Sequence, residues 1–133
     1  MKIFVNEPSI KGNEKKYLIK AIKDGFVSSS GPFVEKFENQ FAKRVNRKFA
    51  ISVSNGTAAL QLATEALDIK KNDEVILPSF TIISCVLPIV RCGAKPVLID
   101  SDPQTWNMNV NKIEEKITLK TKAIIAPHIY GLP

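Results

Sequence analysis

The stretch Ser54-Asn55-Gly56-Thr57 carries the clearest chemical signal in the chain. An apolar run, Phe49–Val53, precedes it and predicts a short buried strand, while residues 57–67 have a helical pattern. A helix that begins directly after a strand offers unpaired backbone N–H groups and a positive dipole end, which predicts an anion site, most usefully for a phosphate. Gly56 permits close backbone approach, and the polar side chains can add hydrogen bonds. Ser, Asn and Thr are also good N-caps, so an ordinary capped helix explains the same residues.

Other candidate residues are less specific. His128 is the only histidine, and no acidic partner or nucleophile lies at a diagnostic spacing, so a structural role explains it as well as ligand contact does. The hydroxyl-rich loop Phe26–Gly31 is either a flexible linker or a loop that lines a ligand. The sequence has no His and Cys cluster with metal-ligand spacing and no Gly-x-Gly-x-x-Gly or Walker loop. No metal is therefore predicted.

The elements that must position these residues alternate between strand and helix from residue 49 onward. The predicted strands are 49–53, 74–77, 96–100 and 122–126, and the predicted helices are about 57–67, 81–91 and 109–117, with a kink at Pro88. This alternation predicts an α/β fold with a mostly parallel sheet and flanking helices.

Ligands of such sheets lie beyond the carboxyl ends of the strands. Four segments are therefore expected to surround one crevice: residues 54–57, 78–82, 100–102 and 127–130. Lys48, Lys95 and Lys122 fall at the opposite ends of their strands and are poor candidates for chemistry. Asp100 and Asp102 are expected to cap the turn at Pro103, and Trp106 and Met108 to pack.

Residues 1–48 are expected to form an amino-terminal arm and two helices, and residues 49–133 the α/β part. After an extended arm over residues 1–8, the first helix is expected to begin at an Asn13 cap and to end at Gly25. The second helix is expected to begin at Pro32. It places Phe33, Phe37 and Phe41 on one face, which predicts a core contribution.

Composition excludes several classes of protein. The 133 residues are 44% hydrophobic and 24% charged, typical of a soluble globular domain. The net charge of +6 comes from lysines spread through nearly every segment, which argues against a nucleic-acid partner. The longest apolar run, residues 82–90, is too short to span a membrane, and the sequence shows no leader. Cys85 and Cys92 are expected to be free thiols too far apart for a disulfide, which fits a reducing cytoplasm.

Several motifs, in order along nearly the whole chain, resemble the DegT/StrS family of pyridoxal-phosphate-dependent sugar-nucleotide aminotransferases. The motifs are Asp24-Gly25-Phe26-Val27-Ser28-Ser29-Ser30-Gly31, Phe37-Glu38, Ser54-Asn55-Gly56-Thr57-Ala58-Ala59-Leu60, Asp73-Glu74-Val75-Ile76-Leu77-Pro78-Ser79-Phe80-Thr81, Gly93-Ala94-Lys95-Pro96-Val97, Ile117-Thr118, Thr121-Lys122-Ala123-Ile124-Ile125 and His128-Ile129-Tyr130-Gly131. The run Asp102-Pro103-Gln104-Thr105-Trp106-Asn107-Met108 is similar to the perosamine-synthase branch.

The resemblance implies the amino-terminal part of a fold-type I, aspartate-aminotransferase-like architecture that works as a homodimer with active sites at the subunit interface. It implies transfer of an amino group from glutamate to a nucleotide-linked 4-keto-6-deoxy sugar, with GDP as the nucleotide in the perosamine branch. Ser54, Asn55, Gly56 and Thr57 are then expected to bind the phosphate of the pyridoxal 5'-phosphate cofactor, with the backbone of Gly56 and Thr57 holding it directly.

The same resemblance assigns the remaining site residues. Ile82 stands where the family commonly has an aromatic ring stacked on the cofactor, so it is expected to cover that ring by apolar contact alone. The loop Gly25, Phe26, Val27, Ser28 and Ser29 resembles one that meets the sugar substrate. His128 joins these expected substrate-binding residues.

Family members are much longer, and the resemblance places their Schiff-base lysine and the acidic partner of the pyridine nitrogen after the position of Pro133. We therefore expect an amino-terminal fragment without catalytic residues, inactive alone, and either aggregation-prone or dependent on a partner chain. Two alternatives stay open at this point. One is a non-catalytic α/β module that binds a phosphate or nucleotide, and the other is a pyridoxal-phosphate-dependent sugar dehydratase of the same family.

Overall fold

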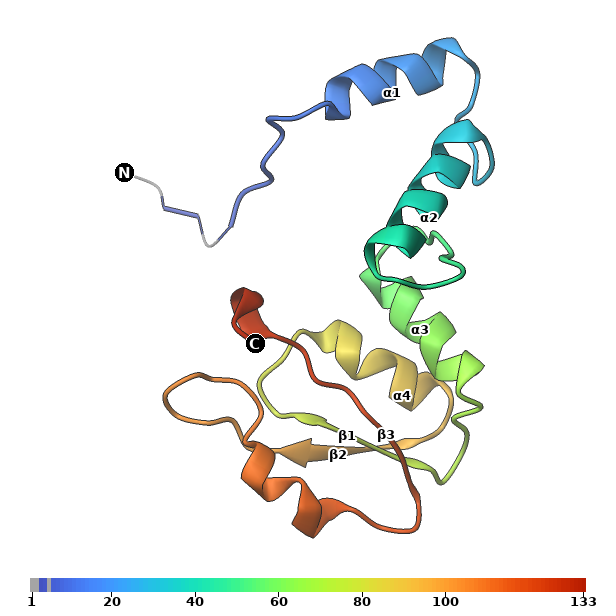
Figure 1. Ribbon diagram of the computed structural model, residues 1–133. Coiled ribbons are helices and arrows are strands. Elements are labelled where there is room, and N and C mark those ends of the chain that lie inside the picture. The colour runs from blue at the N-terminus through green and yellow to red at the C-terminus, as the bar shows by residue number, and fades with distance from the viewer. Residues whose placement is uncertain (1–2, 5) are drawn as a thin grey trace. The chain divides into compact units, whose positions relative to one another are not determined.

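The structure, a computed structural model, describes residues 3–4 and 6–133 and divides between Ser52 and Val53 into two compact units. The first unit contains α1 (Glu14–Lys23) and α2 (Pro32–Arg44). The second contains α3 (Gly56–Ala66), β1 (Glu74–Pro78), α4 (Leu87–Arg91), β2 (Lys95–Ile99) and β3 (Thr121–Ile124) (Figure 1). Four 3-10 turns complete the second unit: Ile83–Cys85, Val110–Lys112, Glu114–Lys116 and Ile129–Gly131. The extended arm expected over residues 1–8 includes residues 1, 2 and 5, which lie outside the described residues.

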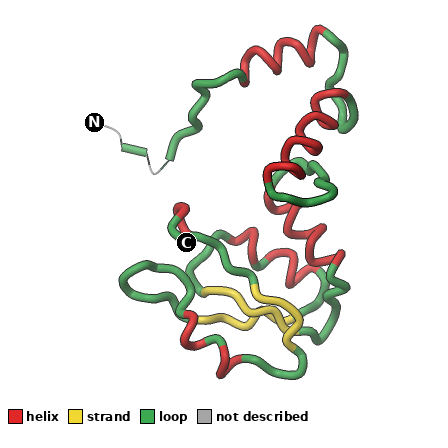
Figure 2. Tube along the Cα trace, viewed as in Figure 1, coloured by secondary structure: helices red, strands yellow, loops and turns green. Residues whose placement is uncertain are grey.

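The sheet of the second unit, yellow in Figure 2, is entirely parallel, and its strand order is β2-β1-β3. Glu74, the first residue of β1, pairs with Lys95 in β2 and with Thr121 in β3. The predictions of strands at 74–77, 96–100 and 122–126, and of an α/β fold with a parallel sheet, are confirmed. Because the strands are parallel, their carboxyl ends meet at one edge of the sheet.

The core lies against one face of β1. Val75 and Leu77 alternate onto the same face and pack with Cys85, Ile89 and other buried apolar residues. All five residues of β1 are buried, which is the expected consequence of its central place in the sheet. Burial of each large apolar side chain contributes about 1.5–3 kcal/mol, so β1 and the turn and helix above it anchor the unit.

The strand predicted at 49–53 is wrong. This segment has no regular secondary structure, and Phe49 and Ile51 are 74% and 72% exposed. No strand among the described residues pairs with it. A strand is stabilised by the ladder to its neighbour, so an apolar run without a neighbour stays an irregular extended segment.

The predictions of continuous helices at 81–91 and 109–117 are also wrong, because each segment forms shorter helical pieces. The first is divided into the 3-10 turn Ile83–Cys85 and the short helix α4, and Pro88 lies in the first turn of α4. Proline lacks the N–H that a helix interior requires, so a helix can begin at this point but cannot run through it. The second consists of the two 3-10 turns Val110–Lys112 and Glu114–Lys116.

The first unit has little core of its own. Phe37 and Phe41, expected to be core residues, are 55% and 49% exposed, and Ala42 is the only buried residue of α2. Two helices cannot enclose these aromatic rings, so the four rings pair instead. Phe37 stacks on Phe41, and Tyr17 meets Phe33 edge to face, each pair at 5.7 Å between ring centroids. The predicted Asn13 side-chain cap is absent from α1.

Candidate phosphate-binding site

The first turn of α3 is fixed by a side-chain cap that leaves two of its backbone donors unpaired. Asn55 is the N-cap residue in an extended conformation, and its Oδ1 accepts a hydrogen bond from Ala58 N at 2.9 Å. Its backbone carbonyl accepts the first helical bond, from Ala59 N at 3.1 Å. The N–H groups of Gly56 and Thr57 find no acceptor among the described residues, because they precede the first helical bond. These two donors remain available to an external anion.

Space and charge at this turn both suit an anion. A Cβ built on Gly56 would meet no atom within 4 Å, so the backbone lies open to a ligand. The first turn of α3 carries no acidic side chain, and the helix dipole places partial positive charge there. Ser54 is exposed and its hydroxyl accepts from Asn55 Nδ2 at 3.2 Å. The residues present therefore fit a phosphate group.

Ser84 is a neighbour of this turn that the sequence reasoning missed. Thr57 Oγ1 and Ser84 Oγ lie 2.8 Å apart and share a partly buried hydrogen bond. Ser84 belongs to the 3-10 turn Ile83–Cys85, which packs against α3. A hydroxyl within the apolar run 82–90 was the only signal in the sequence that could have singled it out.

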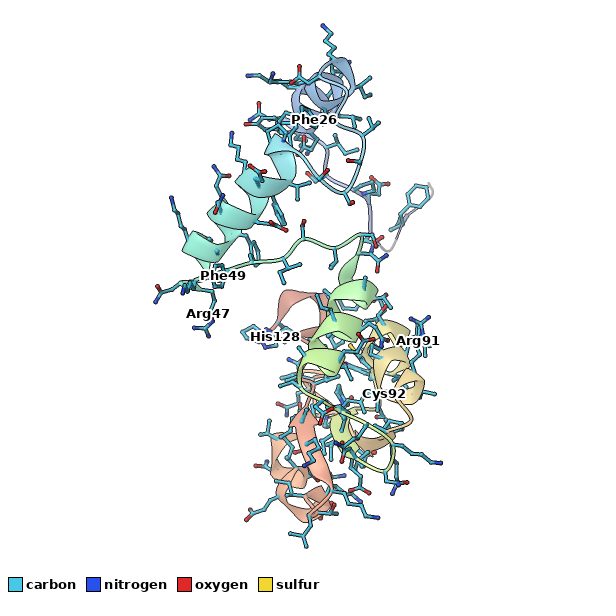
Figure 3. The ribbon with its side chains drawn as sticks, turned by 90° about the vertical axis from the view of Figure 1, so that its right-hand side faces the viewer. Phe26, Arg47, Phe49, Arg91, Cys92 and His128 are labelled. Carbon is cyan, nitrogen blue, oxygen red and sulfur yellow. The ribbon has the colours of Figure 1, made fainter. Side chains whose placement is uncertain are left out.

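A groove of about 600 Å³ begins at the cap and continues along α3. It is lined by Val53, Asn55, Thr57, Ala58, Gln61, Leu62, Glu65 and Arg91. Figure 3 labels Arg91 and His128 on opposite sides of α3 in that view.

The segments after β1 and β2 are brought together at the carboxyl edge of the sheet. Ser79 N donates to Ile99 O at 2.8 Å, and the rings of Phe80 and Trp106 meet edge to face at 5.5 Å. Trp106 is not packed away as expected, because 58% of it stays exposed. Ile82 precedes the 3-10 turn of Ser84 and is 64% exposed, so its apolar side chain is free to cover a ligand.

The two aspartates after β2 have different roles. Asp102 Oδ1 accepts from Gln104 N and Thr105 N, both at 2.9 Å, so its predicted capping of the turn is confirmed. These bonds lower the pKa of Asp102, with the Thr105 N–H as the largest cause. Asp100 does not cap the turn. It pairs with Lys112 at 2.8 Å, and this hydrogen-bonded cation lowers the pKa of its carboxyl group.

Asn107, also missed by the sequence reasoning, ties the loop after β2 to the segment of His128. Its Oδ1 accepts from Ile129 N at 3.2 Å, and its Nδ2 donates to Leu132 O at 3.0 Å. His128 itself is exposed and directly precedes the turn Ile129–Gly131. The backbone on its carboxyl side is therefore fixed while the imidazole stays accessible.

The loop Gly25–Ser29 belongs to the first unit and is exposed. Gly25 has a φ of +76° and ends α1, where Phe26 N donates to Ala21 O at 2.9 Å, so the predicted glycine stop is confirmed. The Ser28 hydroxyl lies 3.2 Å from that of Ser30 and accepts from Ser30 N. Val27 is 78% exposed, and Ser29 is exposed as well.

The amino ends of the strands contain structural contacts. Glu74 Oε2 accepts from Thr118 Oγ1 at 2.7 Å, and its Oε1 accepts from Lys95 Nζ at 3.2 Å. The Thr118 bond is the largest cause of the lowered pKa of Glu74, followed by Lys95. Lys48 lies over the ring of Phe49, 5.1 Å from its centroid, and Lys122 is exposed on β3. Lys95 therefore has a structural partner, as its position predicted.

Three further features bear on the predicted class of protein. Cys85 is buried and Cys92 half-buried, and both are free thiols, as expected. Within residues 3–4 and 6–133, no helix is both long and apolar enough to cross a bilayer. The same residues contain no cluster of three or more His, Cys, Asp and Glu side chains suited to a metal ion.

Comparison with known proteins gives consistent matches. The sequence model of the DegT/DnrJ/EryC1/StrS aminotransferase family matches residues 8–133. A GDP-perosamine synthase of Escherichia coli O157:H7 is 48% identical over 129 residues, which cover 97% of this chain and 35% of that protein. The aminotransferase of Psychrobacter cryohalolentis superposes with a TM-score of 0.87 at 36% identity, covering 98% of this chain and 33% of that one.

A third match is a solved structure of a sugar dehydratase. A GDP-4-keto-6-deoxymannose-3-dehydratase, solved with a trapped PLP-glutamate geminal diamine, superposes with a TM-score of 0.78 at 30% identity. The match covers 90% of this chain and 32% of that one. The chain thus spans about a third of the length of the proteins it matches.

Proposed function

The chain belongs to the DegT/DnrJ/EryC1/StrS aminotransferase family, and on this premise we propose that it binds the phosphate of pyridoxal 5'-phosphate in a sugar-nucleotide aminotransferase. The observation that carries the proposal is the pair of unpaired N–H donors of Gly56 and Thr57 at an open helix start. Backbone donors at the positive end of a helix are a well-suited site for a phosphate dianion. Because Asn55 Oδ1 is already engaged by Ala58 N, this side chain shapes the turn and leaves anion binding to the backbone.

The chain's own residues bind and orient the cofactor. Gly56 and Thr57 hold the phosphate, Ser54 adds an exposed hydroxyl, and Ile82 covers the ring by apolar contact. When bound, pyridoxal phosphate supplies an electron sink for moving an amino group between a donor and a carbonyl acceptor. The aliphatic side chain of Ile82 excludes water from one face of the cofactor's pyridine ring but cannot stack on it. The phosphate contacts therefore provide a larger share of the binding free energy.

For substrates, we infer glutamate as the amino donor and a GDP-linked 4-keto-6-deoxy sugar as the acceptor. The name of the 48%-identical relative from Escherichia coli, and of a second from Vibrio cholerae, supports GDP-perosamine as the product. The exposed loop Gly25–Ser29 and the accessible His128 are the residues of this chain that we assign to the sugar nucleotide.

We also infer a homodimer that acts in the cytoplasm. Large apolar side chains are exposed in both units, Phe37 and Phe41 in the first and Ile83 and Val90 in the second, which favours burial against further protein surface. The free thiols Cys85 and Cys92 suit a reducing compartment.

The phosphate assignment is tested by titrating the chain with pyridoxal 5'-phosphate and, separately, with pyridoxal, which lacks the phosphate. We expect the phosphorylated form to bind more tightly. We expect Gly56→Val to lower its affinity by about tenfold or more, because the added side chain fills the open space beside Gly56 and keeps the phosphate from the backbone N–H donors. Ala63→Val adds a similar bulk at an exposed position further along α3 and is the matched control. Equal affinity for both ligands, or an unchanged affinity in Gly56→Val, would contradict the assignment.

A sugar dehydratase is the second candidate, favoured by the structural match to the GDP-4-keto-6-deoxymannose-3-dehydratase. Mass spectrometry of the sugar nucleotide, after incubation with this chain joined to the remaining two thirds of a matching relative, separates the two activities. Amino transfer replaces the 4-keto oxygen with an amino group and consumes glutamate stoichiometrically. A dehydratase instead yields a sugar that has lost its 3-hydroxyl group and kept the carbonyl group. Accumulation of the amino sugar supports the first proposal.

A further inference from the structure

We propose that Ser84 is a positioning residue that turns the Thr57 hydroxyl proton toward the cofactor phosphate. The proposal rests on the phosphate-binding function proposed above, and it assigns to Ser84 a role through Thr57 rather than a direct contact with the cofactor. Its basis is the 2.8 Å hydrogen bond between the two hydroxyl groups at the first turn of α3.

Neither hydroxyl has another hydrogen-bonding partner among the described residues. A hydroxyl group carries one donor hydrogen and two acceptor lone pairs, so either group can donate in this bond while the turn is empty. A phosphate offers only acceptors at neutral pH. If Thr57 is to bind it through its side chain, Thr57 must donate to the phosphate and accept from Ser84.

The direction of the bond therefore has a consequence for affinity. With Ser84 as the donor, the Thr57 hydrogen is directed away from Ser84 and remains available to the anion. A donated hydrogen bond also polarises the accepting hydroxyl and strengthens the bond that this hydroxyl then donates. Without Ser84, the Thr57 hydroxyl loses both its orientation and this polarisation.

Ser84 is carried on a well-anchored turn. Cys85 N donates to Ile82 O and Val86 N to Ile83 O, both at 3.0 Å, which closes the 3-10 turn on either side of Ser84. The neighbouring Cys85 is 4% exposed and belongs to the core cluster that includes Val75 and Leu77 of β1. Thr57 is β-branched, which restricts its χ1 angle. The pair is thus formed by a side chain on an anchored turn and a side chain with a restricted χ1 angle, from elements that pack together.

The test measures the dissociation constant of pyridoxal 5'-phosphate and the amide shifts of ¹⁵N-labelled Gly56 and Thr57 during the titration, on the intact chain. We expect Ser84→Ala to weaken binding about three- to tenfold, the range of one hydrogen bond, and to reduce the Thr57 shift change. Ser84→Thr keeps the hydroxyl and should restore both. Thr64→Val removes a hydroxyl that bonds Leu60 O elsewhere on α3, and should leave binding unchanged.

A double-mutant cycle tests whether Ser84 acts through Thr57. In a Thr57→Val background, Ser84→Ala should cause no further loss of affinity. Additive losses, an unchanged affinity in Ser84→Ala, or equal losses in Ser84→Ala and Ser84→Thr would each overturn the positioning role. Such results leave the phosphate site itself intact. Wild-type chain that binds pyridoxal as tightly as pyridoxal 5'-phosphate would instead overturn the proposed function, and the positioning role with it.

Discussion

One carboxylate oxygen of Glu38 accepts two hydrogen bonds from Ser52, from the backbone N–H at 2.7 Å and from the hydroxyl at 2.9 Å. This contact ties the irregular segment before Val53 to the middle of α2, within the first unit. The two bonds lower the pKa of Glu38, with the Ser52 N–H as the larger cause. The segment 49–53, which the sequence predicts to be a strand, is thus held near its end by one carboxylate oxygen of Glu38.

Replacing Glu38 should release this segment. In Glu38→Ala we expect the Ser52 amide to exchange with solvent on the order of tenfold faster, because its charged acceptor is lost. Glu35→Ala, an exposed carboxylate in the first turn of α2, is the matched control and should leave that exchange unchanged. Since the pKa of Glu38 is lowered, the protection should persist above its ordinary value of 4.5 and be lost as the pH falls through the lowered value. Hydrogen exchange that is slow in Glu38→Ala would refute the tether.

Asn55 allows capping and anion binding to be separated. Asn55→Ala should destabilise the second unit by about 0.5–2 kcal/mol, because the acceptor for Ala58 N is lost. Asn55→Asp keeps a capping oxygen and should keep the stability, measured by urea unfolding. The added negative charge should nonetheless weaken pyridoxal 5'-phosphate binding by repulsion. Tight binding of the phosphate by Asn55→Asp would place the anion away from this turn.

The bond between Glu74 and Thr118 makes stability depend on pH. The pKa of Glu74 is lowered by Thr118, then by Lys95, with a smaller contribution from Lys120. A lowered carboxyl pKa contributes stability that is present above the ordinary value of 4.5 and is lost as the pH falls through the lowered value. The stability difference between wild type and Thr118→Val should therefore shrink below that pH, measured by urea midpoints. In a Glu74→Gln background the difference should be independent of pH.

Gly31 and Gly25 form a matched pair for testing backbone strain. Both have a positive φ, of +129° and +76°, which L-residues rarely adopt. A Cβ at Gly31 would also lie 2.6 Å from Cδ1 of Phe26, whereas one at Gly25 would meet nothing within 4 Å. Gly25→Ala should therefore lower the free energy of unfolding by about 1 kcal/mol, and Gly31→Ala should lower it further. Thermal unfolding of the two variants measures the difference. If Phe26→Ala does not reduce the excess cost at Gly31, the clash is not its cause.

Local signals sufficed to predict the sheet and the start of α3. The strand β1 follows Asp73 and ends at Pro78, before Ser79, so its apolar run has clear ends. Turn-forming or polar residues bound β2 and β3 in the same way. The cap at Asn55 follows from residue type alone. These features depend on residues a few positions apart, which is why the sequence was enough.

Features that depend on distant contacts were not predictable. Whether Phe49–Val53 forms a strand depends on a neighbouring strand, which no local pattern reveals. The pairing of Thr57 with Ser84 depends on the 3-10 turn before α4, whereas the sequence predicts a helix over residues 81–91 that is kinked at Pro88. Asn107 reaches Ile129 and Leu132 across two loops whose course follows from the whole sheet. The side chains that support the site are thus harder to predict than its backbone donors.

The strand order β2-β1-β3 has a consequence for how the second unit folds. Along the chain, β3 lies more than twice as far from β1 as β2 does. Closing a longer loop costs more entropy, so pairing of β1 with β2, assisted by the apolar turn and α4 between them, forms the lower-cost nucleus. Addition of β3 then pairs β1 on its second side. It also forms the edge of the sheet at which the His128 segment meets Asn107.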